Sequence, residues 1–116
     1  MTDLTQPTTF RAAIYSRVST KDKGQETENQ AAQLRDFCAV MKWPIVKEYQ
    51  DHASGAAANR EQFRKMLDDA SRRKFDIVLF WSLDRFSREG ALQTLQYLQQ
   101  LTSYGLHYRS YTEQYL

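Results

Sequence analysis

Charged and hydroxyl side chains follow the apolar segments of this sequence in three groups, each at the point where a strand would end. The groups are Arg17 and Ser19; Asp51, Ser54 and Arg60; and Asp84, Arg85 and Arg88. Arginine stays protonated at physiological pH, and its planar guanidinium forms paired hydrogen bonds with phosphate oxygens. A serine hydroxyl among such cations is suited to attack on a phosphodiester, an anion whose transition state spreads negative charge over its oxygens.

Phosphodiester attack assigns a role to each of these side chains. Ser19 is the predicted nucleophile, and the arginines supply the fixed positive charge that a metal ion supplies in other enzymes. Asp51 and Asp84 are expected to orient guanidinium groups, and the serine proton passes to Asp84 or to solvent. His52 is the only histidine that follows a predicted strand, so the sequence does not indicate a serine and histidine pair. A serine phosphodiester keeps the bond energy of the link it replaces, so cutting and rejoining needs no nucleotide cofactor.

Four apolar segments predict the strands that place these side chains. They cover residues 10–15, 45–51, 75–81 and 106–111. Apolar residues between them recur at the spacing of amphipathic helices: Leu34, Phe37, Cys38 and Met41; Phe63, Met66, Leu67 and Ala70; and Leu92, Leu95 and Leu98. Strands that alternate with helices through short links indicate an α/β fold, with a mostly parallel sheet and helices on both faces. Ligands of such sheets bind at the carboxyl ends of the strands, so the three groups are expected to converge on one edge.

Length and composition indicate a single domain. The chain has 116 residues, and residues 1–9 are expected to be a flexible lead-in to a domain over residues 10–116. The net charge is only +2, so composition alone does not indicate a nucleic-acid binder. The single cysteine, Cys38, lies in an apolar helical stripe and is predicted to be a buried structural thiol. With no apolar run of membrane-spanning length and no signal peptide, we expect a cytoplasmic protein without a membrane partner.

Other classes of protein fit the same pattern less well. A phosphoacceptor receiver domain has an aspartate after a strand, as Asp51 is, but it would need acidic residues in place of Arg17 and Ser19 to hold magnesium. A metal nuclease could use the two aspartates with Glu89, but the arginines at the same edge would repel its cation. A cysteine phosphatase needs an arginine at a set distance after its cysteine, where this chain has Pro44. The alternative that the residues leave open is a catalytically idle interaction or regulatory domain on the same fold.

Three ordered segments give the sequence a specific resemblance to a known family. The stretch YSRVST, then Gln30, then DHASG with Arg60, and then LDRFSR are similar to the catalytic domain of the serine recombinases, the resolvase and invertase family. The similarity runs from residue 12 to residue 111, and it does not distinguish resolvases, invertases, transposases and large integrases. It implies a resolvase-like α/β domain with flavodoxin-like layering, in which Ser19 becomes linked to a 5′ DNA phosphate.

The resemblance also implies roles for the remaining residues and for partners. The phosphate-binding set that it implies is Arg17, Ser54, Arg60, Arg85 and Arg88. The residues that it implies for positioning this set are Gln30, Asp51, Ser54 and Asp84. Family members act on DNA as homodimers that pair into synaptic homotetramers, they are carried by mobile elements, and they use no metal or other cofactor. Because they continue into a dimerisation helix and a DNA-binding domain, this chain is expected to be a catalytic domain that does not recombine DNA alone.

Overall fold

The fold consists of one sheet and four helices in the part of the chain that the structure describes. The computed structural model describes residues 9–19, 25–54, 57–58, 60–87 and 89–113. The strands are β1 (Ala12–Ser19), β2 (Ile45–Ser54), β3 (Ala57–Ala58), β4 (Ile77–Phe80) and β5 (His107–Ser110). The helices are α1 (Gln25–Met41), α2 (Glu61–Ser71), α3 (Leu83–Phe86) and α4 (Ala91–Ser103). Among these helices, none has the length and apolar character needed to cross a bilayer.

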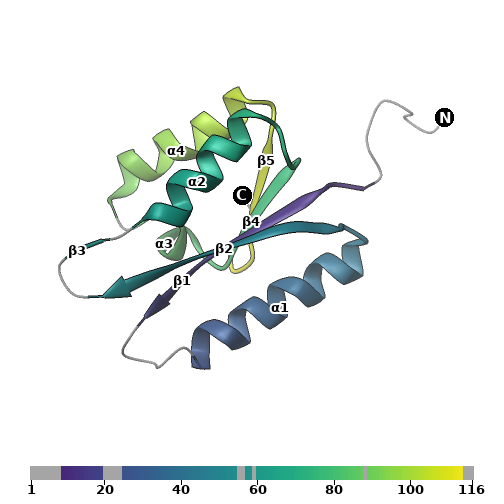
Figure 1. The fold of residues 1–116 in the computed structure, drawn as a ribbon, viewed down its shortest axis with the longest axis horizontal. Helices are drawn as coiled ribbons and strands as arrows, with labels where there is room; N and C mark the ends of the chain where they lie inside the picture. The colour runs from purple at the N-terminus through teal and green to yellow at the C-terminus, as the bar shows by residue number, and fades with distance from the viewer. Residues whose placement is uncertain (1–8, 20–24, 55–56, 59, 88, 114–116) are drawn as a thin grey trace.

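The sheet is mostly parallel, as the sequence predicted, and it has one short antiparallel edge strand that was not predicted. Its strand order is β3-β2-β1-β4-β5. The strands β1, β2, β4 and β5 pair in parallel, and only β3 runs antiparallel, against the end of β2. Figure 1 shows α1 on one side of this sheet and α2 and α4 on the other. The prediction of an α/β fold with helices on both faces is therefore confirmed.

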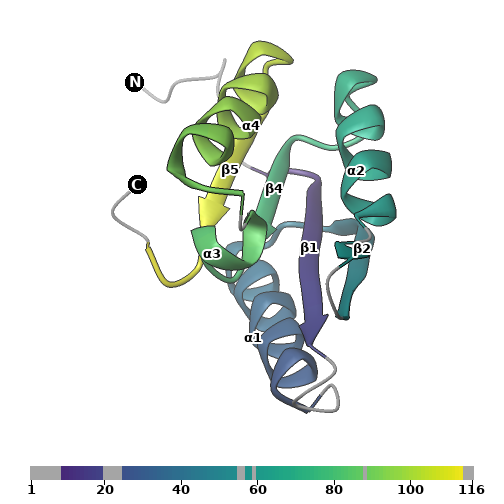
Figure 2. The same ribbon diagram turned by 90° about the vertical axis from the view of Figure 1, so that its left-hand side faces the viewer.

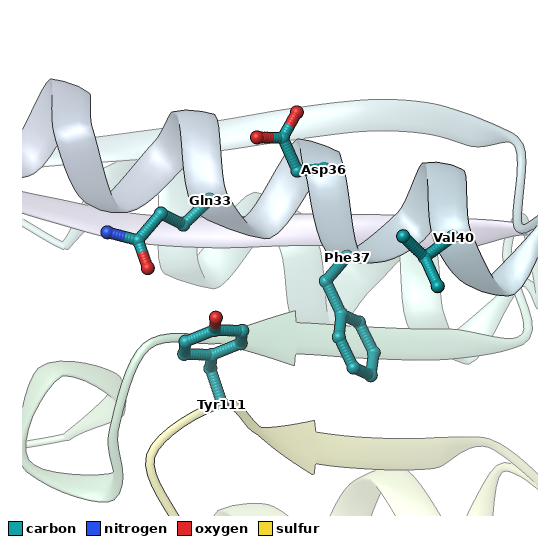
Figure 3. A pocket seen from close by; sticks show the side chains of 5 residues that line it. All are labelled: Gln33, Asp36, Phe37, Val40 and Tyr111. Carbon is teal, nitrogen blue, oxygen red and sulfur yellow. The ribbon is translucent and has the colours of Figure 1, made fainter.

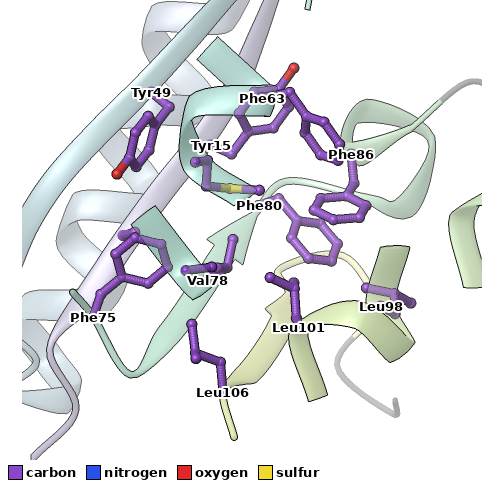
Figure 4. Packing of buried hydrophobic residues seen from close by; sticks show 13 residues of the cluster. Tyr15, Tyr49, Phe63, Phe75, Val78, Phe80, Phe86, Leu98, Leu101 and Leu106 are labelled. Atoms are coloured by element: carbon purple, nitrogen blue, oxygen red, sulfur yellow. The ribbon is translucent and has the colours of Figure 1, made fainter. Parts of the chain in front are cut away.

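Each face of the sheet has its own hydrophobic core, because side chains alternate along β1. Ala12 and Ile14 pack with Leu34 and Cys38 of α1 on one face. Ala13 and Tyr15 lie on the other face, in an aromatic core under α2, α3 and α4. This second core contains Tyr15, Tyr49, Phe63, Phe75, Phe80 and Phe86 (Figure 4). Arg17 follows Ala13 and Tyr15 in this alternation and is buried, so β1 places a cation on the aromatic face.

Several predicted boundaries differ from the structure. The first strand does not end at Tyr15 but continues through Ser19, since its hydrogen bonds to β2 continue past the apolar run. The second predicted strand ends at Ser54 instead of Asp51, and the third begins at Ile77 instead of Phe75. The last helix does not bury Leu92 and Leu95, which are 72% and 57% exposed.

The buried face of α4 carries other residues, namely Thr94, Leu98 and Leu101. The stretch that precedes α4 forms the separate short helix α3 instead of an early start of α4. At Ser87 the backbone returns to an extended conformation, with φ −153° and ψ 132°, and this ends α3. Leu92, Leu95 and Leu98 all lie within α4, but each step of three residues turns about 300°, so this stripe rotates about 120° between Leu98 and Leu92 and leaves the buried face.

Cys38 is buried beneath the sheet, as predicted, and burial raises the pKa of its thiol from 9.0 to about 11. The thiolate is the form that reacts with alkylating agents, and at pH 8 this shift lowers its population about a hundredfold. We therefore expect iodoacetamide to label the native protein at pH 8 at least about a hundred times more slowly than the protein unfolded in guanidinium chloride. Mass spectrometry of timed samples measures both rates, and equal rates would contradict the burial of Cys38.

Candidate active site

The carboxyl ends of the parallel strands form one edge of the sheet, where the predicted site residues gather. Arg17 lies beside Asp51 in the register of β1 and β2, and Ser19 lies beside Ala53. The structure describes the backbone of Ser19 and not its side chain. Figure 2 shows α3 at the end of the sheet toward which β1 and β5 point. Three segments far apart in sequence therefore meet at this edge.

Asp51 connects the end of β2 to the start of α2. Its side chain is buried, and it accepts hydrogen bonds from the amides of Gln62 and Phe63 at 2.8 and 2.9 Å. These amides belong to the first turn of α2, where backbone N–H groups have no partner within the helix. The Tyr15 hydroxyl donates to the same carboxylate at 2.8 Å. These contacts support a positioning role for Asp51, because they hold the segment that presents Arg60.

We expect Asp51→Asn to lower the free energy of unfolding by about 3 kcal/mol, because an amide cannot replace this carboxylate. In one orientation the NH2 group of the asparagine would face the Gln62 amide, and in the other it would face the Phe63 amide and the Tyr15 hydroxyl. In either case a donor loses its acceptor. Urea denaturation followed by circular dichroism measures the change. The matched control is Asp68→Asn, which removes an exposed ion pair with Arg72 and should change stability by less than about 1 kcal/mol. Equal losses in the two variants would contradict this account of Asp51.

Arg60 lies just before α2, and only 7% of the residue is exposed. Its Nη1 donates to Glu89 Oε2 at 2.8 Å, and its Nη2 donates to the Phe86 carbonyl oxygen and, at 3.4 Å, to the Tyr15 hydroxyl. The guanidinium carbon lies 3.6 Å from the centre of the Phe63 ring. Its Nε is buried without a hydrogen-bond partner among the described residues. A guanidinium held on several sides is preorganised, so it loses little freedom when it binds an anion.

Tyr15 and Tyr97 complete the surroundings of Arg60. Burial raises the pKa of Tyr15, an effect that the nearby Arg60 partly offsets, so the side chain remains a neutral phenol. This phenol donates to Asp51 and accepts from Arg60, and it thus links the two charged groups. The Tyr97 hydroxyl on α4 donates to Glu89 Oε2 at 2.9 Å, and it holds the carboxylate that pairs with Arg60.

The remaining predicted residues are only partly brought together. Asp84 is exposed and Arg85 is half-buried, and both lie on α3, whose carbonyl at Phe86 accepts from Arg60. Gln30 is buried on α1, which packs on the opposite face of the sheet from Arg60. Arg88 and the side chain of Ser54 lie outside the described residues.

Several residues of this edge were not predicted from the sequence. The sequence places Tyr15 in an apolar strand. It lies two residues before Arg17 and four before Ser19, so its side chain points to the same face of the strand, and this spacing was the available signal. Tyr97 carried no signal, because an aromatic residue on a helix is typical of a core position. Glu89 was considered only as a possible metal ligand, and the structure pairs it with Arg60 instead. Within the described ranges, no three His, Cys, Asp or Glu side chains lie close enough together to hold a metal ion.

A shallow hollow elsewhere on the molecule has a different character. It lies between α1 and the segment after β5, has a volume of about 250 Å³, and is lined by Gln33, Asp36, Phe37, Val40 and Tyr111 (Figure 3). The rings of Phe37 and Tyr111 meet edge to face there, with their centres 5.9 Å apart. None of its lining residues is a cation, so this hollow is not suited to binding a phosphate.

The fold has counterparts among solved structures of serine recombinases. The catalytic domain of the TP901-1 integrase is 30% identical, with a TM-score of 0.77 over 90% of this chain and 78% of that one. A resolvase family site-specific recombinase from Streptococcus pneumoniae is 27% identical, with a TM-score of 0.81 over 90% of this chain and 73% of that one. The catalytic domain of ISC1926 TnpA, an IS607-like serine recombinase, is also 27% identical, with a TM-score of 0.77 over 87% and 67% of the two chains. The class is thus that of serine recombinase catalytic domains.

The family follows from the sequence match. The family described as "Resolvase, N terminal domain" matches residues 12–116. The chain therefore belongs to the resolvase family, and its fold is that of the catalytic domain of enzymes for site-specific recombination. The resemblance inferred from YSRVST, DHASG and LDRFSR is confirmed.

Proposed function

We propose that this domain cuts and rejoins DNA through a covalent link to Ser19. The Ser19 oxygen attacks a backbone phosphorus, the P–O3′ bond breaks, and a free 3′ hydroxyl leaves while the 5′ phosphate stays on the serine. The serine proton goes to Asp84 or to solvent, and the departing 3′ oxygen takes up a proton. Rejoining is the same reaction in reverse, with the 3′ hydroxyl of the exchanged strand as nucleophile. Every bond broken is matched by one formed, so no nucleotide is consumed.

The observation that carries the proposal is the buried, preorganised guanidinium of Arg60 at the sheet edge where β1 ends. Arg17 is buried on the same edge, and Arg85 lies on α3, which contacts Arg60 through the Phe86 carbonyl. Fixed cations that need no rearrangement stabilise a pentacoordinate phosphorus more effectively than mobile surface charges do. We assign Ser54 and Arg88 to the same phosphate-binding set, with Gln30 as a further positioning residue. We also propose that the active species on DNA is a homodimer that pairs into a tetramer.

A covalent adduct assay tests the proposal. The protein is incubated with supercoiled plasmid and with a random pool of end-labelled duplexes, and the reaction is stopped with detergent. We expect labelled DNA to migrate with the protein, and peptide mass spectrometry to find a nucleotide on Ser19 after nuclease digestion. The adduct should form equally well in the presence of EDTA, because arginines supply the positive charge.

Two results would reject the proposed mechanism in different ways. Loss of the adduct in EDTA would show that a metal ion takes part in the reaction. A protein that assembles as a tetramer on the duplexes but never forms an adduct would be a catalytically idle domain.

A further inference from the structure

The chain continues to follow the loop after β4 beyond the end of β5. The Tyr111 amide donates to the Phe80 carbonyl and the Thr112 amide donates to the Trp81 carbonyl, both at 2.9 Å. The rings of Trp81 and Tyr111 stack, with centres 4.9 Å apart and planes inclined by 20°. The segment after β5 is therefore fastened to the segment that leads into α3.

Glu113 makes the last of these contacts, with the first residue of α3. Its Oε1 accepts a hydrogen bond from the Leu83 amide at 2.8 Å and another from the Ser110 hydroxyl. Leu83 begins α3, and an amide at the start of a helix has no acceptor within the helix. A carboxylate suits that position, because a hydrogen bond to a charged acceptor is stronger than one to a neutral oxygen. Ser110 orients the carboxylate from the end of β5.

The helix that Glu113 holds cannot be stable by itself. It has four residues, which is far too few for a helix to form without outside contacts. Its anchors include the Ser82 hydroxyl, which accepts from the Arg85 amide at 3.2 Å, the buried ring of Phe86, the Arg60 guanidinium on the Phe86 carbonyl, and Glu113. Asp84 and Arg85 lie between the anchors at its two ends.

We propose that Glu113 is a positioning residue for Asp84 and Arg85, a role that rests on the proposed function of this edge. Without its carboxylate the Leu83 amide loses its partner, and α3 can shift relative to β1 and Arg60. A displacement of about 1 Å at a reacting centre is enough to lower a rate by about a hundredfold. DNA binding depends on many phosphate contacts and should change little.

A merely stabilising role for Glu113 predicts a different result, and the chain offers a matched control for it. Asp76 precedes β4 at the opposite edge of the sheet, where it accepts from the Arg11 amide at 2.8 Å and pairs with the Arg11 guanidinium at 3.0 Å. Like Glu113, it is a carboxylate that fastens one backbone segment to another. Asp76→Ala should therefore lower stability without reaching α3.

The experiment compares wild type, Glu113→Ala, Glu113→Gln and Asp76→Ala with two readouts. The first is the single-turnover rate of adduct formation at saturating DNA, corrected for the folded fraction, together with DNA affinity. The second is hydrogen exchange at the amides of Leu83, Asp84 and Arg85, measured by NMR. We expect Glu113→Ala to lower the rate about ten- to a hundredfold, with affinity within about twofold, and to speed exchange at these amides at least about tenfold. Glu113→Gln keeps the acceptor oxygen and should stay within about fivefold of wild type, and Asp76→Ala should match wild type in both readouts.

The proposal is overturned if Glu113→Ala slows adduct formation no more than Asp76→Ala, or if exchange in α3 is unchanged. If the wild-type protein forms no adduct, the exchange experiment still tests whether Glu113 positions α3. Faster exchange confined to α3 in Glu113→Ala would retain the positioning of α3 by Glu113 and reject only the chemistry proposed for Ser19. Unchanged exchange would reject both.

Discussion

Ser19→Ala should form no detectable covalent adduct with DNA, a loss of at least about a thousandfold relative to wild type. The reason is that alanine has no oxygen to attack the phosphorus. DNA affinity should stay within about twofold, because the arginines proposed to bind phosphate are unchanged. Detergent-resistant label on the protein, counted after electrophoresis, measures the adduct, and a gel shift of the same samples measures binding.

Ser16→Ala is the matched control for this variant. Ser16 lies on the same strand and is buried. Because side chains alternate along a strand, it follows Ala12 and Ile14 on the α1 face of the sheet, away from Arg17. Removing its hydroxyl alters the same type of side chain on β1 without reaching the proposed site, so the adduct should form at the wild-type rate. An adduct that persists in Ser19→Ala, or that is lost equally in Ser16→Ala, would remove Ser19 from the role of nucleophile.

The arrangement of the sheet could be predicted from local patterns in the sequence. Continuous apolar runs such as residues 77–80 are typical of strands covered on both faces, and β4 is indeed buried throughout. Short links between alternating strands and helices permit few topologies, and they bring the carboxyl ends of the strands to one edge. The positions of Arg17, Asp51 and Arg85 at that edge follow from these rules alone.

The contacts within the edge could not be predicted, because they depend on packing between distant segments. Asp51 caps α2 from a neighbouring strand, and nothing in the local sequence around either element indicates this. Arg60 is buried only because the ring of Phe63, the carbonyl of Phe86 and the carboxylate of Glu89 come together around it.

The buried face of α4 could not be predicted from its leucines alone, because residues three apart drift by about 60° per step around a helix. Leu92 and Leu95 turn progressively away from the face that Leu98 shares with Thr94 and Leu101, and they are exposed.

Arg60→Ala should lower the rate of adduct formation by about a hundred- to a thousandfold. Its guanidinium is held by Glu89, by the Phe86 carbonyl and by the Phe63 ring, so its charge is fixed before the phosphate arrives. Removing it takes away a charge whose placement needs no reorganisation in the transition state. Arg60→Lys should lose nearly as much, because an ammonium group cannot reach both acceptors or stack on the ring as a planar guanidinium does. Single-turnover rates at saturating DNA, corrected for the folded fraction of each variant, measure the effect.

A structural role for Arg60 would lower the rate only by reducing the folded fraction, and two measurements separate it from a catalytic role. Arg64→Ala removes the same charge from an exposed site four residues further along α2, and it should leave the rate within about twofold of wild type. Free guanidinium ion, at concentrations below those that unfold the protein, should restore part of the adduct in Arg60→Ala, because it can occupy the space left over Phe63. It should restore nothing in Ser19→Ala, which lacks the nucleophile itself. If Arg60→Lys reacts at the full wild-type rate, the positive charge suffices and the fork of the guanidinium is not needed. If Arg60→Ala reacts at that rate once corrected for its folded fraction, Arg60 serves only to join α2 to α3.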